Sequence, residues 1–188
     1  MRRRRHTLYG LLLTLGILAG APWALTQAVW GDQENVGGNA FSTGSVDIAA
    51  SPASAALSLS DMAPGDKSTA TLSMSNAGTL DLRYSMTTGI AASSTLADGL
   101  TLRVKESVTD CSNGGFDGTG TSLYSGALSG GAFGDPTQGA DAGDRALAAG
   151  AGEDLCFQVE LPSGAANTLQ SLSTTATFTF DAEQVANN

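Results

Sequence analysis

The sequence predicts an all-β, jelly-roll-like β-sandwich of about eight antiparallel strands. Three observations lead to this prediction: apolar and polar residues alternate over five separate runs, Thr fills many of the polar positions, and turn-forming residues separate the runs. Alternation with a period of two gives a strand one apolar and one polar face. Because strands of this kind cannot all bury their apolar faces in one flat sheet, two sheets packed face to face are expected.

The alternation is clearest in five runs, and three weaker runs complete the set. The strong runs are residues 68–76, 80–86, 100–105, 155–161 and 175–180, and the weaker runs are residues 41–48, 55–60 and 122–128. The segment 63–66 has Pro followed by Gly, which is the order of a type II turn. Asn76-Ala77-Gly78 supplies residues that tolerate positive φ, so a hairpin is predicted between the first two strong runs.

The middle of the chain differs in composition from the rest. Residues 112–152 hold 12 of the 24 glycines, with Asp, Ser and Ala between them. This composition predicts a long Gly/Asp-rich excursion over the surface, and long excursions are often functional. Within it, residues 144–149 are expected to form one short helical turn.

Residues 1–28 have the layout of a secretory signal peptide. Four arginines and His6 form a positive region, an apolar run over residues 8–21 follows, and small residues precede a cleavage site after Ala28. The apolar run is shorter than the ~20 residues of a membrane span. Retention of this segment as an N-terminal anchor is the alternative, so contact with a membrane is expected only through it. Beyond it, the sequence predicts an N-terminal segment with the first strand over residues 29–48 and a sandwich domain over residues 41–188.

Charge and histidine content exclude several classes of function. Without residues 1–28 the chain has 5 basic and 18 acidic residues, a difference of −13. Such a chain is a poor partner for nucleic acid, because phosphate binding needs clustered Lys and Arg. The only histidine, His6, would be lost on export, which leaves none for a catalytic triad or a His-ligated zinc. Glu106 and Glu160 are the two carboxylates that we consider as a hydrolase pair.

Cys111 and Cys156 are the only cysteines, and both lie in the predicted exported part. An oxidising environment favours a disulfide between them. Two thiols without histidine cannot complete a structural zinc site, which also favours the disulfide.

Oxygen-bearing side chains occur at two places in the Gly-rich region and its approach. Asp110, Asn113 and Asp117 form one candidate calcium site, and Asp141 with Asp144 forms a second candidate of the same kind. A solvated Gly/Asp loop is the alternative interpretation of both. No other cofactor is expected.

Large apolar residues are concentrated in the segment that export would expose. Val29, Trp30, Val36 and Phe41 lie there among Gly, Asn and Gln, and an indole on a free terminus is costly to leave in water. One interpretation is that Trp30 folds back onto its own domain. The other is that the segment adds a strand to an exposed sheet edge of a second copy. Because donor and acceptor surfaces differ, such a contact propagates into a homo-oligomer or filament.

Four motifs resemble those of the TasA/camelysin family of secreted bacterial and archaeal surface proteins. They are Ala28-Val29-Trp30-Gly31-Asp32, the segment 38–48, Met62-Ala63-Pro64-Gly65-Asp66 and Asn76-Ala77-Gly78-Thr79-Leu80. The resemblance implies a jelly-roll domain, export through a dedicated signal peptidase, and assembly into biofilm-matrix or surface fibres with residues 29–41 as the donated strand. Some members are described as metallopeptidases, but the predicted exported part has neither a His nor a His-Glu-x-x-His motif.

The leading hypothesis is therefore a secreted, non-enzymatic structural protein, a subunit of extracellular matrix or cell-surface fibres that assembles by N-terminal strand donation. A monomeric cell-surface module that binds glycan or calcium is the alternative. A secreted camelysin-like peptidase is the third hypothesis.

Overall fold

The computed structural model describes residues 40, 42–54, 57 and 60–185. The chain divides into two units, Met1–Phe41 and Ser42–Asn188, and all described residues except Ala40 belong to the second. The predicted signal peptide and the predicted donor residues Val29, Trp30, Val36 and Phe41 lie outside the described residues. Within the described part, no helix is long and apolar enough to cross a membrane.

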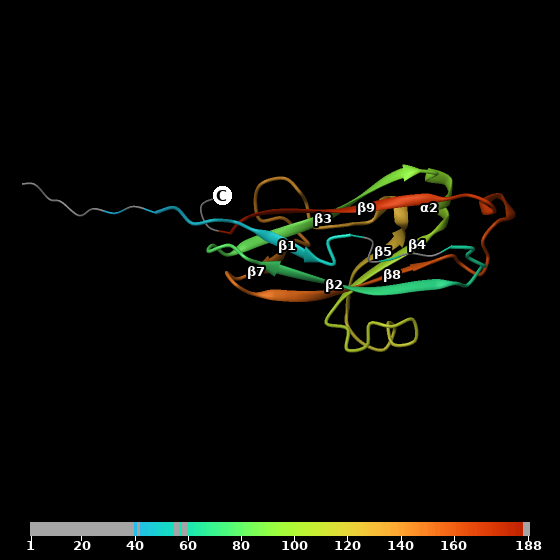
Figure 1. The fold of residues 1–188 in the computed structure, drawn as a ribbon, viewed down its shortest axis with the longest axis horizontal. Helices are drawn as coiled ribbons and strands as arrows, with labels where there is room; N and C mark the ends of the chain where they lie inside the picture. The colour runs from blue at the N-terminus through green and yellow to red at the C-terminus, as the bar shows by residue number, and fades with distance from the viewer. Residues whose placement is uncertain (1–39, 41, 55–56, 58–59, 186–188) are drawn as a thin grey trace, which may run out of the picture. The chain divides into compact units, whose positions relative to one another are not determined.

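Two antiparallel sheets pack as a β-sandwich, which confirms the predicted fold class (Figure 1). The first sheet has the order β1 (Ile48–Ser51), β2 (Lys67–Asn76), β8 (Gly152–Glu160), β4 (Thr101–Glu106) and β5 (Thr121–Ala127). The second sheet consists of β3 (Leu82–Ala92), β6 (Ala132–Phe133), β7 (Arg145–Leu147) and β9 (Thr174–Gln184). Because β9 pairs with β3 along its whole length, β6 and β7 share the opposite edge of β3. The short helix α2 (Ser94–Gly99) and the 3-10 turns η1 (Leu128–Gly130) and η2 (Asn167–Leu169) connect strands.

The hydrophobic core lies between the two sheets, where alternate residues of the long strands point inward. Its most deeply buried members are Met74, Leu82, Tyr84, Met86, Leu102, Val104, Leu155 and Phe157. Full burial of a side chain of this size stabilises the fold by ~1.5–3 kcal/mol. The strong alternating runs of the sequence correspond to β2, β3, β4, β8 and β9, so the period-two pattern located the core strands correctly.

The turn before β2 forms as predicted. The amide of Asp66 donates to the carbonyl of Ala63 (2.9 Å), and Gly65 has a φ of 98°. Only glycine adopts that φ without strain, which is why the Pro-Gly order works at this turn.

The predicted hairpin at residues 76–78 is wrong, because β2 and β3 belong to different sheets. The chain instead crosses from one sheet to the other around Asn76, which is 1% exposed. Its side-chain amide donates to the carbonyls of Leu80 (2.8 Å) and Leu147 (3.2 Å), and its carbonyl accepts from the Gly78 amide (2.9 Å). The buried amide therefore holds a sheet crossover where the local sequence indicated a turn between paired strands.

Four other sequence predictions need correction. The predicted strand over residues 41–48 begins only at Ile48, and the described residues of the predicted strand over 55–60 are not in a strand. Strand β5 confirms the predicted strand over 122–128, but the Gly-rich stretch 112–152 also contains β6 and β7, and the expected helical turn at 144–149 contains strand β7 instead. Pairing with β3 overrides local composition there, since Arg145, Ala146 and Leu147 align with Tyr84, Arg83 and Leu82.

A charged cluster joins the two sheets beside the core. Arg145 of β7 donates to the Glu106 carboxylate of β4 (2.5 Å) and to both oxygens of Glu153 of β8. The hydroxyl of Tyr84 on β3 also donates to Glu153 (2.7 Å). Burial and the neighbouring Glu153 carboxylate raise the pKa of Tyr84. Burial lowers the pKa of Arg145, but its two carboxylate partners more than offset this, so the guanidinium stays charged.

Arg145→Met is expected to lower the free energy of unfolding by about 3–5 kcal/mol, because two half-buried carboxylates lose their counter-charge. Urea denaturation at neutral pH measures the loss. The matched control is Lys67→Met, which removes the more exposed Lys67–Glu160 pair (3.5 Å) and should cost under ~1 kcal/mol. Equal losses in the two variants would contradict the role given to the cluster.

Candidate functional site

An elongated groove with a volume of about 620 Å³ opens along one side of the sandwich. It lies between the β1–β2 edge of the first sheet and strand β9 of the second. The lining residues are uncharged, and they are Ala50, Pro52, Ala53, Ser54, Leu57, Met62, Ser68, Leu72, Leu100, Leu128, Phe157, Val159, Thr174, Thr175, Ala176, Thr177, Phe178 and Phe180.

The groove exists because the strands on its two sides differ in length. Strand β1 has four residues and pairs only with residues 73–76 of β2. Among the described strands, none pairs with residues 68–72 of β2 on that side, and none pairs with the outer edge of β9. Two unpaired strand edges therefore face one another across the groove, and unpaired edges bind an added strand readily.

The walls of the groove are apolar at depth and hydroxylated at the rim. Phe157 of β8 and Phe178 of β9 pack against one another across it, with ring centroids 5.0 Å apart. Thr174, Thr175 and Thr177 of β9 contribute hydroxyls. This lining suits an extended, uncharged peptide with small or apolar side chains, bound by its backbone at the edges and by its side chains in the groove.

The described chain joins the sandwich at the end opposite to the groove. Ser45 accepts from the amides of Thr79 (3.0 Å) and Leu80 (3.1 Å), beside the crossover from β2 to β3. The carbonyl of Asp47 accepts from the Ala77 amide (2.8 Å). Along β2, the distance from this crossover to the groove-lining Ser68 is about 26 Å, at ~3.3 Å per residue. Residues 45–51 thus belong to their own domain, and a donor segment can include only the residues before them.

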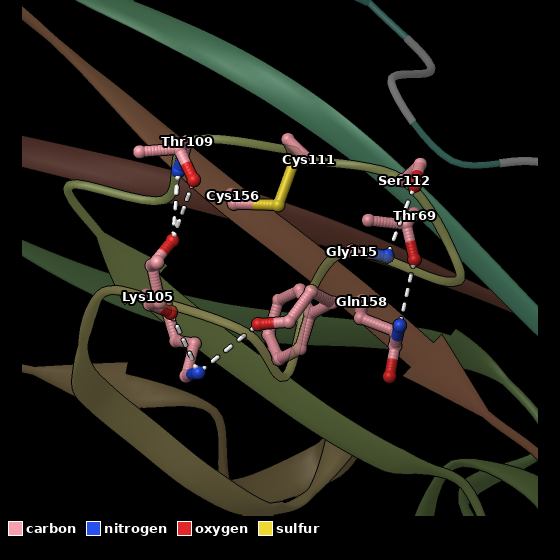
Figure 2. The surroundings of a disulfide bond; sticks show 10 residues. Thr69, Lys105, Thr109, Cys111, Ser112, Gly115, Cys156 and Gln158 are labelled. Carbon is pink, nitrogen blue, oxygen red and sulfur yellow. Dashed lines mark hydrogen bonds between the residues drawn. A yellow bond between two sulfur atoms is a disulfide. The ribbon is translucent and has the colours of Figure 1, made fainter.

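The predicted disulfide is confirmed. Cys111 and Cys156 are bonded, with their Cα atoms 5.7 Å apart. Figure 2 shows the bond between β8 and the loop of residues 107–120, which covers the outer face of the first sheet (Figure 1). A disulfide is consistent with an extracellular protein.

The covering loop explains a feature that alternation did not predict. Strand β8 was expected to have one solvent-exposed face, yet Cys156 and Gln158 on that face are 2% and 0% exposed. Phe116 of the loop is completely buried there, with the cations of Arg103 and Lys105 at 4.8 and 5.1 Å from its ring centroid. The ammonium of Lys105 also donates to the carbonyls of Phe116 (3.0 Å) and Thr119 (2.9 Å). An aromatic residue five positions after Cys111 in a Gly-rich loop was the only sequence signal for this packing.

Two residues of the first candidate calcium site, Asn113 and Asp117, have protein partners. Asp117 forms an ion pair with Arg103 (2.6 Å), and the Asn113 amide donates to the Lys67 carbonyl (3.0 Å). The Asp110 carboxyl lies against Gly115, where an added Cβ would be 2.1 Å from its Cγ. Among the described residues, no three His, Cys, Asp or Glu side chains form a group that could hold a metal ion. Calcium binding at Asp110, Asn113 and Asp117 stays a prediction.

The carboxylates considered as a hydrolase pair lie at opposite ends of two paired strands. Glu106 aligns with Leu155, whereas Glu160 aligns with Thr101. Five residue pairs separate them, or about 17 Å at ~3.4 Å per residue. Glycosidase carboxylates lie about 5–9.5 Å apart, so this pair does not fit that chemistry.

The comparison with known families bears on the first half of the chain. Residues 10–98 match the family model of the camelysin metallo-endopeptidases. This part of the chain is similar to the camelysin family. The resemblance seen in the sequence motifs is thereby confirmed, and the matched camelysin region includes β1, β2 and β3. No curated protein matches the chain.

The name of the camelysin family implies a catalytic metal ion, and the described residues do not fit one. Metallopeptidases hold zinc with His and carboxylate ligands, and the only histidine, His6, lies outside the described residues. Glu106, Glu153 and Glu160 each bind a guanidinium or ammonium group. No catalytic step is therefore derived through a metal in this domain.

Replacing both cysteines by serine is expected to lower the free energy of unfolding by about 3–4 kcal/mol, because the unfolded chain loses a closed loop whose ends are 45 residues apart. Chemical denaturation of the oxidised wild type and the Cys111→Ser, Cys156→Ser protein measures this loss. Hydrogen exchange should accelerate in residues 107–120 and stay slow in β3 and β9. Uniform acceleration over both sheets would show that the disulfide does more than hold the loop.

Proposed function

We propose that the exported form of this protein is a non-enzymatic subunit of extracellular matrix or cell-surface fibres. Residues 29–41 of one copy form a strand in the groove of the next copy. The single observation that carries the proposal is the uncharged groove between two unpaired strand edges. An added strand would pair with such an edge through its backbone and would cover the exposed part of the core.

The chemistry of the segment supports this occupant. Residues 29–41 number 13 and span about 43 Å when fully extended, at ~3.3 Å per residue. This exceeds the ~26 Å between the crossover and Ser68 along β2. Residues 35–41 are uncharged, and so are the residues that line the groove. In an extended strand, Val36, Gly38 and Ala40 would lie on the same face, and all three are small.

Donation to a second copy is favoured over folding back. The described chain joins its own sandwich at residues 45–47, at the end opposite to the groove. A segment that filled its own groove would first have to reverse direction and run the length of the sandwich. A contact between unlike surfaces on successive copies needs no reversal and propagates into a filament.

Removing the donor segment provides the first test. An exported form without residues 29–41 should stay folded and monomeric, because no described contact of the sandwich involves those residues. Size-exclusion chromatography and negative-stain imaging measure the loss of polymers, with circular dichroism as the check on folding. Filaments of undiminished length would refute strand donation.

Blocking the acceptor groove provides the second test. Ala176 lines the groove on β9, so Ala176→Glu should stop polymer growth while the monomer folds normally, since a carboxylate there excludes an apolar strand. The matched control is Ala146→Glu at an exposed position of β7, which should polymerise like the wild type.

Mixing the two defective proteins makes the test specific. The deletion variant keeps an open groove and Ala176→Glu keeps a donor segment, so the mixture should form one-to-one dimers and no filaments. Dimers measured by analytical ultracentrifugation at a single stoichiometry would require one donor and one acceptor surface in each copy. If no dimers form, the donor segment does not bind in the groove, and the proposal is contradicted.

The camelysin family's description as metallo-endopeptidases keeps a peptidase as the second candidate. The exported form should release no peptides from casein above a buffer control, with or without added zinc, because the described residues offer no ligand group for the ion. Hydrolysis that a chelator abolishes and zinc restores would establish the peptidase instead.

A further inference from the structure

A small acidic cup lies on the outer face of the second sheet, apart from the groove. It has a volume of about 210 Å³ and is enclosed by residues of β3, of β9 and of the loop that joins β6 to β7. Two alternate residues of β9, Asp181 and Glu183, face it together with Ser85 of β3. The loop contributes Asp135 and Asp144, the latter from the second oxygen-rich pair noted in the sequence.

The charge of the cup is not balanced by its lining. Four carboxylates and no cation line it: Asp135, Asp144, Asp181 and Glu183. Arg83 forms an ion pair with Glu183 (2.6 Å), which neutralises that one group. The Asp181 carboxylate has no hydrogen-bond or ion-pair partner among the described residues, although its backbone pairs with β3. Like charges gathered in a partly enclosed space repel one another, and a bound cation relieves this repulsion.

Two buried oxygens at the cup have no partner within the described part of the chain. The hydroxyl of Ser85 is unsatisfied although the residue is only 1% exposed. Oε2 of Glu183 is unsatisfied as well. Buried polar atoms in proteins are nearly always bonded to protein, water or a ligand, so these oxygens indicate that something else occupies the cup.

The loop is built to keep its carboxylates at the cup. Asp144 accepts from the amides of Asp135 (3.0 Å) and Asp141 (3.1 Å), one at each oxygen. Gly134 has a φ of 68°, and an added Cβ would lie 2.6 Å from Asp144 Oδ1 and 2.9 Å from the Ser85 Cβ. Only glycine therefore permits this close approach of the loop to the sheet. Oδ1 of Asp135 accepts hydrogen bonds from the Thr137 amide (2.9 Å) and hydroxyl (2.8 Å), which hold this carboxylate in place within the loop.

We propose that the acidic cup binds one divalent cation of the calcium class, held between Asp135, Asp181 and the Ser85 hydroxyl. Calcium accepts six to eight oxygen ligands in flexible geometry, including carboxylates, neutral oxygens and water. Because no three carboxylates among the described residues converge closely enough to hold a bare ion, water molecules complete the coordination. The ion ties the loop of residues 134–144 to β9, and it does so independently of strand donation.

Isothermal titration of the chelator-treated, exported protein with calcium chloride tests this site at constant ionic strength. We expect one saturable site per chain with a dissociation constant in the range of extracellular calcium modules, about 0.1–1 mM, and weaker binding of magnesium. Asp181→Asn should weaken calcium binding at least tenfold without loss of folding, since the substitution preserves shape and the Asp181 carboxylate has no partner among the described residues to lose. Asp135→Asn should have a similar effect. The matched control is Asp61→Asn, an exposed carboxylate outside the cup.

Two results would overturn the proposal. One is the absence of saturable binding at calcium concentrations up to about ten times the highest dissociation constant of that range. The other is calcium binding that survives Asp181→Asn and Asp135→Asn but is lost in Asp110→Asn or Asp117→Asn, which would assign the ion to the disulfide loop. A rise in the thermal unfolding temperature with calcium, present in the wild type and in Asp61→Asn and absent in Asp181→Asn, would support the cup by a second measurement.

Discussion

Contact between the apolar faces of the two sheets is the interaction on which the rest of this domain depends. The contact is complete over β4, β8 and the first half of β3, where the inward side chains are almost fully buried. It is incomplete along one side, because β1 has only four residues whereas β9 has eleven. The groove is the direct result, and its lining includes the buried core residues Phe157 and Leu72 together with the partly buried residues Met62 and Phe178. In the proposed fibre, a strand from a second copy would cover this side of the sandwich.

The Lys and Arg side chains of the domain bind acceptor groups within the domain itself. The basic residues of the described part are Lys67, Arg83, Arg103, Lys105 and Arg145, and each binds a carboxylate or a backbone carbonyl. The cluster around Arg145 connects the two sheets. The cluster around Arg103 connects the disulfide loop to the first sheet. Because the acids outnumber these cations, the remaining surface charge is negative. A surface of this kind attracts cations and disfavours nucleic acid.

The family match and the chemistry of the described residues point in different directions on catalysis. The camelysin family is named for a metallo-endopeptidase, whereas the described residues include no histidine, and the carboxylates of Glu106, Glu153 and Glu160 bind Arg or Lys side chains. The matched region includes the β1–β2 edge of the groove. The matched residues thus form one edge of the groove, and a family name alone does not establish an activity for this chain.

The sequence by itself determined the fold class, the main core strands, the Pro-Gly turn and the disulfide partners, because each depends on local periodicity or on a count of residues. It did not determine which strands pair, and so Asn76 was interpreted as part of a hairpin when it holds a sheet crossover. It also missed the burial of Gln158 and the position of Ser85 beneath Gly134. The groove and the acidic cup were decided only by the tertiary structure. Each is made by segments more than 80 residues apart in the chain, and no local pattern encodes the space between such segments.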